Sequence, residues 1–308
     1  SQIMPTQHEV HSCYLLNVGA AVFHYGEQSR ALLTSFPQLY HRSEDLYPLI
    51  NQRRVHIDEN IVSFERNLKE LQVARELALA EQEKGNQVLT LVDGSLIPFS
   101  VNRNADKIQN DLIERYGIEL DAFNAAQLPL IGYISHSRSS DLVNVLRVWR
   151  CPYSDSKCQM HCGNLDEEDF PCSEIWPLSD RQLMYSKTQK NSRSAFFHSS
   201  AHWSTAMQTR NWVCFAYLNT GQEAARIEIP HWLFEDKKLL EFSLSALLLQ
   251  IKKGHGYPIT LSEAHNMAVI RQADRSRFFQ LLGQHLMQGR QQRVELSPKE
   301  SKKRRGIV

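Results

Sequence analysis

The sequence predicts an α/β protein in which a mixed sheet is flanked by helices. Apolar runs of strand length occur at residues 88–92, 128–135 and 212–218. Longer segments with apolar residues at helical spacing lie before and between these runs. Residues 219–222 are a turn sequence, and residues 225–230 alternate as the partner strand of a hairpin. Strand and helix patterns that alternate in this way indicate an α/β fold.

The composition is that of an ordinary soluble globular protein. The chain has 308 residues, 42% of them hydrophobic and 22% charged, which suffices for one large or two modest domains. A net charge of +1 gives no overall basic field, so any nucleic-acid surface has to be local. No apolar run approaches the roughly 18 residues of a membrane span, and the first residues lack a signal-peptide pattern. We therefore expect a cytoplasmic protein.

Residues 1–86 are predicted to form an N-terminal helical region. Residues 1–50 mix short apolar runs with polar breaks, which we interpret as an irregular section with short helices. Asp58 is the expected N-cap of a long helix that stops at Gly85. The apolar positions of this helix are Ile61, Phe64, Leu68, Leu71, Leu77 and Leu79. Such a face packs either on the sheet or on a second subunit.

Asp93 ends the first strand and is the main candidate for chemistry. A carboxylate at the end of a buried strand is unfavourable unless a metal or a hydrogen-bond network satisfies it. Gly94 follows and leaves space for a ligand beside that carboxylate. The alternative is an ordinary strand-to-turn aspartate.

Glu119 is a second candidate, on a helix predicted over residues 106–124. Ile108, Leu112, Tyr116 and Phe123 share one face of this helix, and Glu119 falls inside that face. A carboxylate on a buried stripe requires a partner, and a metal shared with Asp93 is one possibility. Gly117 interrupts this helix.

Asp141 follows the next strand, residues 128–135. It either lies in the first turn of a helix capped by Ser139 or Ser140, or it delivers a second carboxylate to a strand end near Asp93. Arg138 and the start of this helix suit a phosphate.

Four cysteines lie close together in a loop rich in Pro, Asp and Gly, the predicted insert at residues 150–173. They are Cys151, Cys158, Cys162 and Cys172, and His161 is a spare ligand. Soft ligands grouped in this way suggest structural zinc or an iron–sulfur cluster. The alternative is free loop thiols.

The later part of the chain supplies further candidates. Residues 187–203 interleave basic and aromatic side chains, which fits either nucleic-acid contact or a solvated loop. His265 lies on a helix over residues 261–270, after a break that contains Tyr257. A lone helical histidine is either a metal ligand or a satisfied structural residue. Residues 291–308 are predicted to form a basic disordered tail.

Taken in order, these motifs resemble the NurA nucleases, most closely their bacterial branch, in which a Cys-containing insert follows the second motif. The matching segments are Leu91–Leu96, Gly132–Ser135 with Ser139–Asp141, Arg226–Trp232, Tyr257–Pro258 and Ala264–His265. The resemblance implies a ribonuclease H-like core within a nuclease domain at residues 87–290. It also implies manganese-dependent cleavage of DNA, as a single-strand endonuclease and a 5′-to-3′ exonuclease. The implied setting is DNA-end processing and repair, as a homodimer working with a HerA-type hexameric ATPase.

By motif, Asp93 and Asp141 match the acidic metal ligands of the family, and Tyr257 and His265 match its C-terminal Tyr and His. Glu119 has no distinct motif and depends only on its place on the helix. Arg138 and Arg226 are expected to contact DNA. Manganese, or magnesium, is the expected active-site ion. The rival interpretations are a non-catalytic adaptor of such an ATPase and a zinc-stabilised nucleic-acid-binding module.

Overall fold

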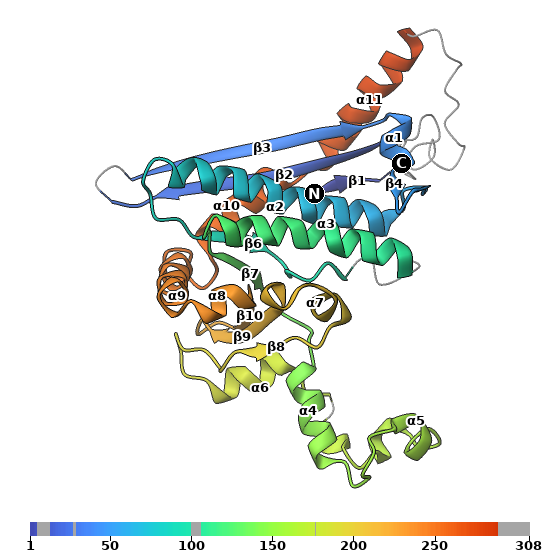
Figure 1. Ribbon diagram of the computed structural model, residues 1–308, viewed down its shortest axis with the longest axis vertical. Coiled ribbons are helices and arrows are strands. Elements are labelled where there is room, and N and C mark those ends of the chain that lie inside the picture. Colours follow the sequence, from blue (N-terminus) through green and yellow to red (C-terminus); the bar gives the residue numbers. More distant parts are fainter. Residues whose placement is uncertain (5–12, 27–28, 100–105, 176, 289–308) are drawn as a thin grey trace, which may run out of the picture.

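The computed structural model shows an elongated α/β molecule (Figure 1). The structure describes residues 1–4, 13–26, 29–99, 106–175 and 177–288. The predicted basic tail lies outside these residues. Among the described helices, none is both long enough and apolar enough to cross a membrane.

The central sheet has five strands in the order β6 (Thr90–Asp93), β7 (Leu130–Ile134), β10 (Ala224–Pro230), β9 (Val213–Asn219) and β8 (Phe197–His198). β6 and β7 run parallel, and the remaining pairs are antiparallel. The sheet is therefore mixed, as predicted. The predicted hairpin is β9–β10, in which Ala224 pairs with Asn219 across the turn.

Strands dominate the N-terminal section, where an irregular section with short helices was predicted, and the one described helix within residues 1–50 is the short α1 (Ser43–Leu46). β2 (Tyr14–His24) and β3 (Arg30–Tyr40) are an antiparallel pair of 11 residues each, and β1 (Gln2–Ile3) adds to β2. Apolar residues are present on both faces of β2, because α2 and α10 both pack against it. This hides the polar–apolar alternation that marks a half-buried strand. The helix α1 (Ser43–Leu46) and the small pair β4 (Leu49–Ile50) and β5 (Arg53–Arg54) follow.

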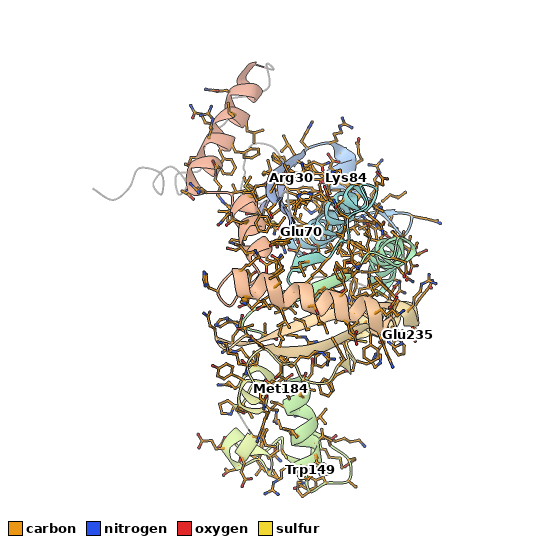
Figure 2. All side chains as sticks on the ribbon, turned by 90° about the vertical axis from the view of Figure 1, so that its left-hand side faces the viewer. Arg30, Glu70, Lys84, Trp149, Met184 and Glu235 are labelled. Atoms are coloured by element: carbon orange, nitrogen blue, oxygen red, sulfur yellow. The ribbon has the colours of Figure 1, made fainter. Side chains whose placement is uncertain are left out.

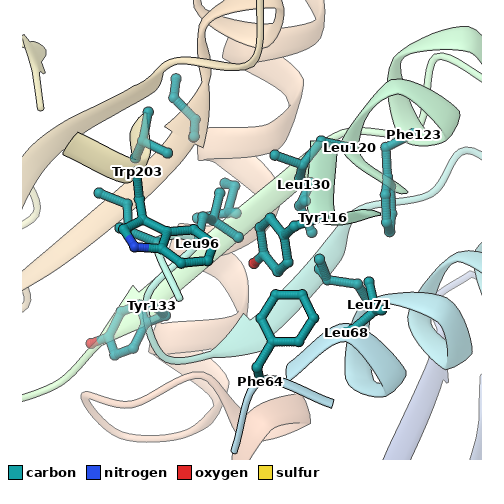
Figure 3. Packing of buried hydrophobic residues seen from close by; sticks show 14 of the residues in the cluster. Phe64, Leu68, Leu71, Leu96, Tyr116, Leu120, Phe123, Leu130, Tyr133 and Trp203 are labelled. Atoms are coloured by element: carbon teal, nitrogen blue, oxygen red, sulfur yellow. The ribbon is translucent and has the colours of Figure 1, made fainter. Parts of the chain in front are cut away.

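Two long helices separate this N-terminal sheet from the central one. In α2 (Glu59–Gln82), the Asp58 carboxylate accepts a hydrogen bond from the Ile61 amide at 2.8 Å and caps the first turn. The helix α3 (Asp106–Ala125) connects β6 to β7. The core between them contains Phe64, whose ring lies 6.2 Å from those of Tyr116 and Trp203 (Figure 3). α2 packs against both β2 and β6, so it joins the two sheets.

Four helices close the described chain. They are α8 (His231–Glu235), α9 (Lys237–Lys253), α10 (Ile259–Ala268) and α11 (Gln272–Gln288). Of these, α8 packs on the central sheet and α10 on both sheets, whereas α11 extends away from them (Figure 1). Gly19 of β2 lies directly against α10, where an added Cβ would overlap the Ala264 carbonyl. The Asn17 side chain donates to the Met267 and Ala268 carbonyls at 3.2 and 3.0 Å and so satisfies the end of α10.

The segment after β7 extends from one end of the molecule (Figure 1). It comprises α4 (Asp141–Arg150), α5 (Cys158–His161), the 3-10 helices η3 (Glu167–Asp169) and η4 (Ser173–Ile175), and α6 (Asp180–Lys187). The segment runs outward through α4 and α5 and returns with α6, which packs against β9 and β10. Trp149, 80% exposed, lies far from Glu70 (Figure 2). The helices α7 (His202–Ala206) and η5 (Thr209–Asn211) then lead into β9.

Candidate active site

Asp93 is the last residue of β6, at the carboxyl end of the parallel pair. It pairs with Tyr133, and the Gly94 amide donates to the Tyr133 carbonyl at 2.9 Å, which fixes the turn after the carboxylate. Gly94 has φ of +131°, a conformation that only glycine adopts readily. Gly132 of β7 lets this turn approach closely, because a Cβ there would lie 2.7 Å from the Gly94 carbonyl oxygen. The Asp93 side chain is 49% exposed, so it faces a space that a ligand can enter.

Two C-terminal side chains converge on Asp93. The Tyr257 hydroxyl donates to Asp93 Oδ1 at 3.0 Å, and His265 Nδ1 lies 3.9 Å from Asp93 Oδ2. Burial and then the Asp93 charge raise the pKa of Tyr257, so the phenol stays protonated and donates. The Tyr257 ring packs edge-on against Tyr133, with centroids 5.3 Å apart. The structure therefore brings together three of the predicted site residues: Asp93, Tyr257 and His265.

Asp93 and His265 line a cavity of about 970 Å³ between β2, α2, β6, α9 and α10. Glu70 of α2 lies in the same wall, with its side chain 33% exposed. Burial raises the pKa of the Glu70 carboxyl, Arg66 opposes this, and the Asp93 charge adds to it. Glu70 and Asp93 therefore line the same cavity, and the Asp93 charge is near enough to act on Glu70.

Glu119 does not join this group. It is buried, as its place on the apolar face of α3 predicts, but its partner is Arg75 of α2, with Nε and Oε1 2.5 Å apart. The direction of the helices explains this: α3 returns from the end of β6 to the start of β7, so a residue late in α3 lies at the strand end opposite Asp93. α2 also runs antiparallel to β6, so Glu70, in the first half of the helix, lies at the end of β6 that carries Asp93.

Asp141 is bound by an arginine rather than acting as a cap. Its Oδ2 accepts from Arg226 Nη1 at 2.7 Å. The start of α4 is capped from α6 instead, because the Asp180 carboxylate accepts from the Leu142 and Val143 amides at 3.1 and 2.8 Å. Asp141 thus lies in the first turn of α4, after Ser140 at the N-cap position, as the first alternative predicts, but the Ser140 side chain makes no cap hydrogen bond.

Arg226 connects Asp141 to the turn that follows Asp93. Its Nε donates to Glu228 Oε1 at 2.8 Å. Glu228 Oε2 in turn accepts from the Ser95 hydroxyl at 2.7 Å and the Leu96 amide at 2.9 Å. The Arg226 side chain is only 4% exposed and lies over the Phe215 ring. This buried guanidinium is paired with two carboxylates, whereas Arg226 was expected to contact DNA.

The end of β7 is organised by a buried carboxylate that sequence reasoning missed. Glu223 accepts from the Ser135 hydroxyl at 2.8 Å and from the His136 amide at 2.8 Å. His136 Nδ1 also lies 3.1 Å from it, and His136 itself has φ of +49°. Glu223 thus fixes the strand end beside Tyr257, whose pKa it also raises. Arg138, two residues after His136, is exposed.

The other three cysteines of the insert are near enough to Cys162 to act on it electrostatically, but among the described residues no three of the four have their sulfur atoms within 4.8 Å of one another. Burial and then the neighbouring thiols raise the pKa of Cys162. Those neighbours are Cys158, Cys151 and Cys172. The remaining predicted ligand, His161, instead lies 2.7 Å from an Asp155 carboxylate oxygen.

The fold is similar to that of a solved nuclease structure. The chain superimposes on the crystal structure of the NurA nuclease from Sulfolobus solfataricus with a TM-score of 0.55, at 14% sequence identity, over 94% of this chain and 82% of that one. The NurA domain pattern matches residues 1–270, and the chain belongs to the NurA family. A sequence search of curated proteins finds no match.

Glu70 could have been found from a second stripe on α2. The residues Arg66, Glu70, Val73, Leu77 and Glu81 recur at helical spacing and all line the cavity. Glu70 itself lies outside the apolar stripe from which this helix was predicted. For Glu223 the signal is weak, because a glutamate just after a hairpin turn is usually solvated.

Proposed function

We propose that this NurA-family protein is a divalent-cation-dependent nuclease that hydrolyses DNA at the Asp93 site. The observation that carries the proposal is the convergence of His265 and Tyr257 on Asp93, beside a cavity that Asp93 and His265 line, although the three come from distant parts of the chain. A phosphodiesterase needs a ligand pair for a cation and a proton-transfer group at one place. These three residues supply both.

The donor set fits manganese or magnesium. Such ions commonly use one or two protein carboxylates and fill their remaining positions with water and substrate phosphate oxygens. Asp93 supplies a half-exposed carboxylate, and an imidazole such as His265 favours manganese over magnesium. Glu70, in the same cavity wall, is the helical carboxylate that we propose in place of Glu119. When bound, the cation would activate water and stabilise charge on the phosphate.

The protein groups have separable roles in this mechanism. Tyr257 orients the Asp93 carboxylate through its 3.0 Å hydrogen bond, and its protonated hydroxyl can also donate to a phosphate oxygen. His265, with a side chain 64% exposed, can accept a proton from the attacking water or return one to the leaving oxygen. Arg226 acts indirectly, since it holds Glu228 and hence the turn after Asp93.

The finer assignments follow from the family likeness and belong to the same proposal. They are single-strand endonuclease and 5′-to-3′ exonuclease activity, DNA-end processing, a homodimer, a HerA-type ATPase partner, membership of the bacterial branch and a ribonuclease H-like core. The exposed Arg138 is the cation that we propose for contact with the DNA backbone. The four insert cysteines are proposed to hold a structural zinc ion or an iron–sulfur cluster, since three of them act on Cys162.

The test is a nuclease assay on single-stranded DNA with Mn²⁺, comparing the wild type with Asp93→Asn. This variant removes the charge while its amide oxygen can still accept the Tyr257 hydrogen bond. Glu174→Gln is the matched control, because Glu174 is 74% exposed and pairs with Arg150 in the protruding segment. We expect cleavage to be lost in Asp93→Asn alone. Equal cleavage by both variants would refute this site.

A second candidate function is a non-catalytic adaptor. The observation that favours it is the Arg226–Asp141 ion pair, which already neutralises the second acidic residue expected to hold a metal. An adaptor would show no Mn²⁺-dependent cleavage in the wild type, with or without an ATPase partner present. Under the nuclease proposal, wild-type cleavage appears and depends on Asp93.

A further inference from the structure

Two histidines and a cysteine converge at the edge of the central sheet away from Asp93. Cys214 lies on β9, His198 on the edge strand β8, and His231 at the start of α8. Cys214 Sγ is 3.5 Å from His198 Nδ1 and 3.7 Å from His231 Nδ1, and the three ligand atoms lie within 4.8 Å of one another. Among the described residues, this is the one group of three or more His, Cys, Asp or Glu side chains placed so closely.

The separations match the edge of a zinc coordination tetrahedron. With Zn–S of about 2.3 Å, Zn–N of about 2.0–2.1 Å and a tetrahedral angle, sulfur and nitrogen ligands are about 3.5 Å apart. Both nitrogens face the sulfur, so an ion between them would bind one thiolate and two imidazoles. A single thiol proton can make only one of the two contacts an S–H···N hydrogen bond.

The surroundings also suit a metal ligand set. Glu235, one turn after His231 in α8, has Oε1 3.5 Å from His231 Nε2. A carboxylate on the far nitrogen of a histidine is the arrangement that commonly orients a metal-bound imidazole. Phe234 packs against both histidine rings. His198 is exposed, which leaves a route for the ion and for a fourth ligand such as water.

We propose that Cys214, His198 and His231 bind one Zn²⁺ ion, separate from the cation at Asp93 and from the insert cysteines. β6 and β8 are opposite edges of the sheet. Cys214 of β9 also pairs with Ile229, which is near the end of β10. Arg226 is near the start of β10 and pairs with Ile134, at the end of β7 that lies beside Asp93. The zinc ion would hold β8 and α8 against the central hairpin. β8 consists of only two residues.

The test is zinc content after the purified protein is stripped with chelator, reconstituted with Zn²⁺ and dialysed. We expect Cys214→Ser and His198→Asn each to bind one zinc equivalent fewer than the wild type. Any zinc held by the insert cysteines is present in all samples and cancels in this difference. His202→Asn is the control, because His202 is also exposed and only four residues from His198.

His198→Asn changes an exposed side chain, so we expect this variant to fold even if Cys214→Ser does not. A second measurement is the thermal midpoint: zinc should raise it more in the wild type than in His198→Asn, because an ion that binds only the folded state stabilises it. Equal zinc content and equal midpoint shifts in wild type and both variants would overturn the proposal. Uptake of copper but not zinc by the wild type would overturn it as well.

Discussion

Tyr257 donates a 3.0 Å hydrogen bond to Asp93 across 164 residues of sequence. Asp93 is fixed by the parallel pairing of β6 with β7, and Tyr257 by the short turn between α9 and α10. Gly254 makes that turn possible, because a Cβ there would overlap the Tyr257 carbonyl. The hydrogen bond therefore links the orientation of the carboxylate to the C-terminal helices that also carry His265.

Tyr257→Phe is expected to lower kcat for DNA cleavage by about tenfold, which corresponds to about 1.4 kcal/mol of transition-state stabilisation. The phenyl ring keeps its packing on Tyr133, but the Asp93 carboxylate loses one fixed donor. Hydrogen bonds to charged groups contribute about 1.5–3 kcal/mol, and exposure of Asp93 reduces this. Steady-state kinetics with Mn²⁺ would measure the change.

Tyr133→Phe is the matched control for this variant. It removes a tyrosine hydroxyl whose partner is Glu223, at 3.4 Å, and leaves Asp93 untouched. We expect its kcat to stay within about twofold of the wild type. If both substitutions lowered kcat equally, the loss would not be specific to the hydroxyl that donates to Asp93.

Gly19→Ala is expected to reduce cleavage strongly although Gly19 makes no contact with Asp93 in the described structure. A Cβ at this position overlaps the Ala264 carbonyl and the Ala268 amide, so α10 has to move away from β2. His265 lies on the displaced helix. We expect a loss of at least about tenfold in kcat/KM, since small misplacement of a proton-transfer group has large effects. Cleavage rates would be compared under conditions where both proteins are folded.

Gly117→Ala serves as the control. Gly117 is in α3, and no atom lies within 4 Å of an added Cβ. Alanine in a helix interior is favoured over glycine by about 1 kcal/mol, so this variant should be at least as stable as the wild type and equally active. Full activity in Gly19→Ala would show that the contact between β2 and α10 does not position His265.

The central hairpin and the strand that ends in Asp93 could be predicted because their signals are local. Apolar runs and a turn sequence suffice for β9 and β10, and the acidic end of β6 is visible in the sequence. The order of the motifs along the chain also identified His265 and Tyr257 as candidate site residues. The β2–β3 hairpin could not be predicted, because burial by helices on both faces removes the alternation that identifies a strand.

The partners of the buried charges could not be predicted either. Glu119 was correctly placed on a buried face, but its partner Arg75 lies 44 residues earlier, on another helix. Arg226 was expected to contact DNA, and its side chain is buried and hydrogen-bonded to two carboxylates. Such pairings depend on how helices and strands pack, and spacing within one element carries no information about them.

Stability is expected to fall in acid partly through Glu81, at the other end of the cavity from Asp93. Lys84 at 2.7 Å, together with His24 and Asn86, holds the pKa of Glu81 at about 2, below its ordinary value of 4.5. A depressed carboxyl pKa contributes stability above pH 4.5, and that stability is lost as the pH falls from 4.5 towards 2. Urea unfolding at a series of pH values would measure the slope.

Glu81→Gln removes this titration, so its stability should change less between pH 5 and pH 3 than that of the wild type. Glu83→Gln, two residues later on an exposed side chain, is the control and should retain the wild-type slope. A wild-type slope in Glu81→Gln would mean that other carboxyl groups account for the acid sensitivity.

Arg226→Met is expected to destabilise the protein by about 3–5 kcal/mol, because it leaves the carboxylate of Glu228 buried without its cation. Glu228 is only 1% exposed, and its remaining donors are the Ser95 hydroxyl and the Leu96 amide. Denaturant unfolding would measure the loss. Asp141 would be freed by the same substitution, but its side chain is 51% exposed and water can solvate it.

The double variant Arg226→Met/Glu228→Gln tests whether the unpaired Glu228 carboxylate causes the loss of stability in Arg226→Met. With the buried charge removed, we expect it to recover more than half of the stability lost in Arg226→Met, since most of that loss is the unpaired carboxylate. Asp141→Asn alone should change stability by less than about 1 kcal/mol, as for exposed ion pairs. If the double variant were no more stable than Arg226→Met, the loss would instead reflect packing of the guanidinium on Phe215, 3.8 Å from its ring centroid.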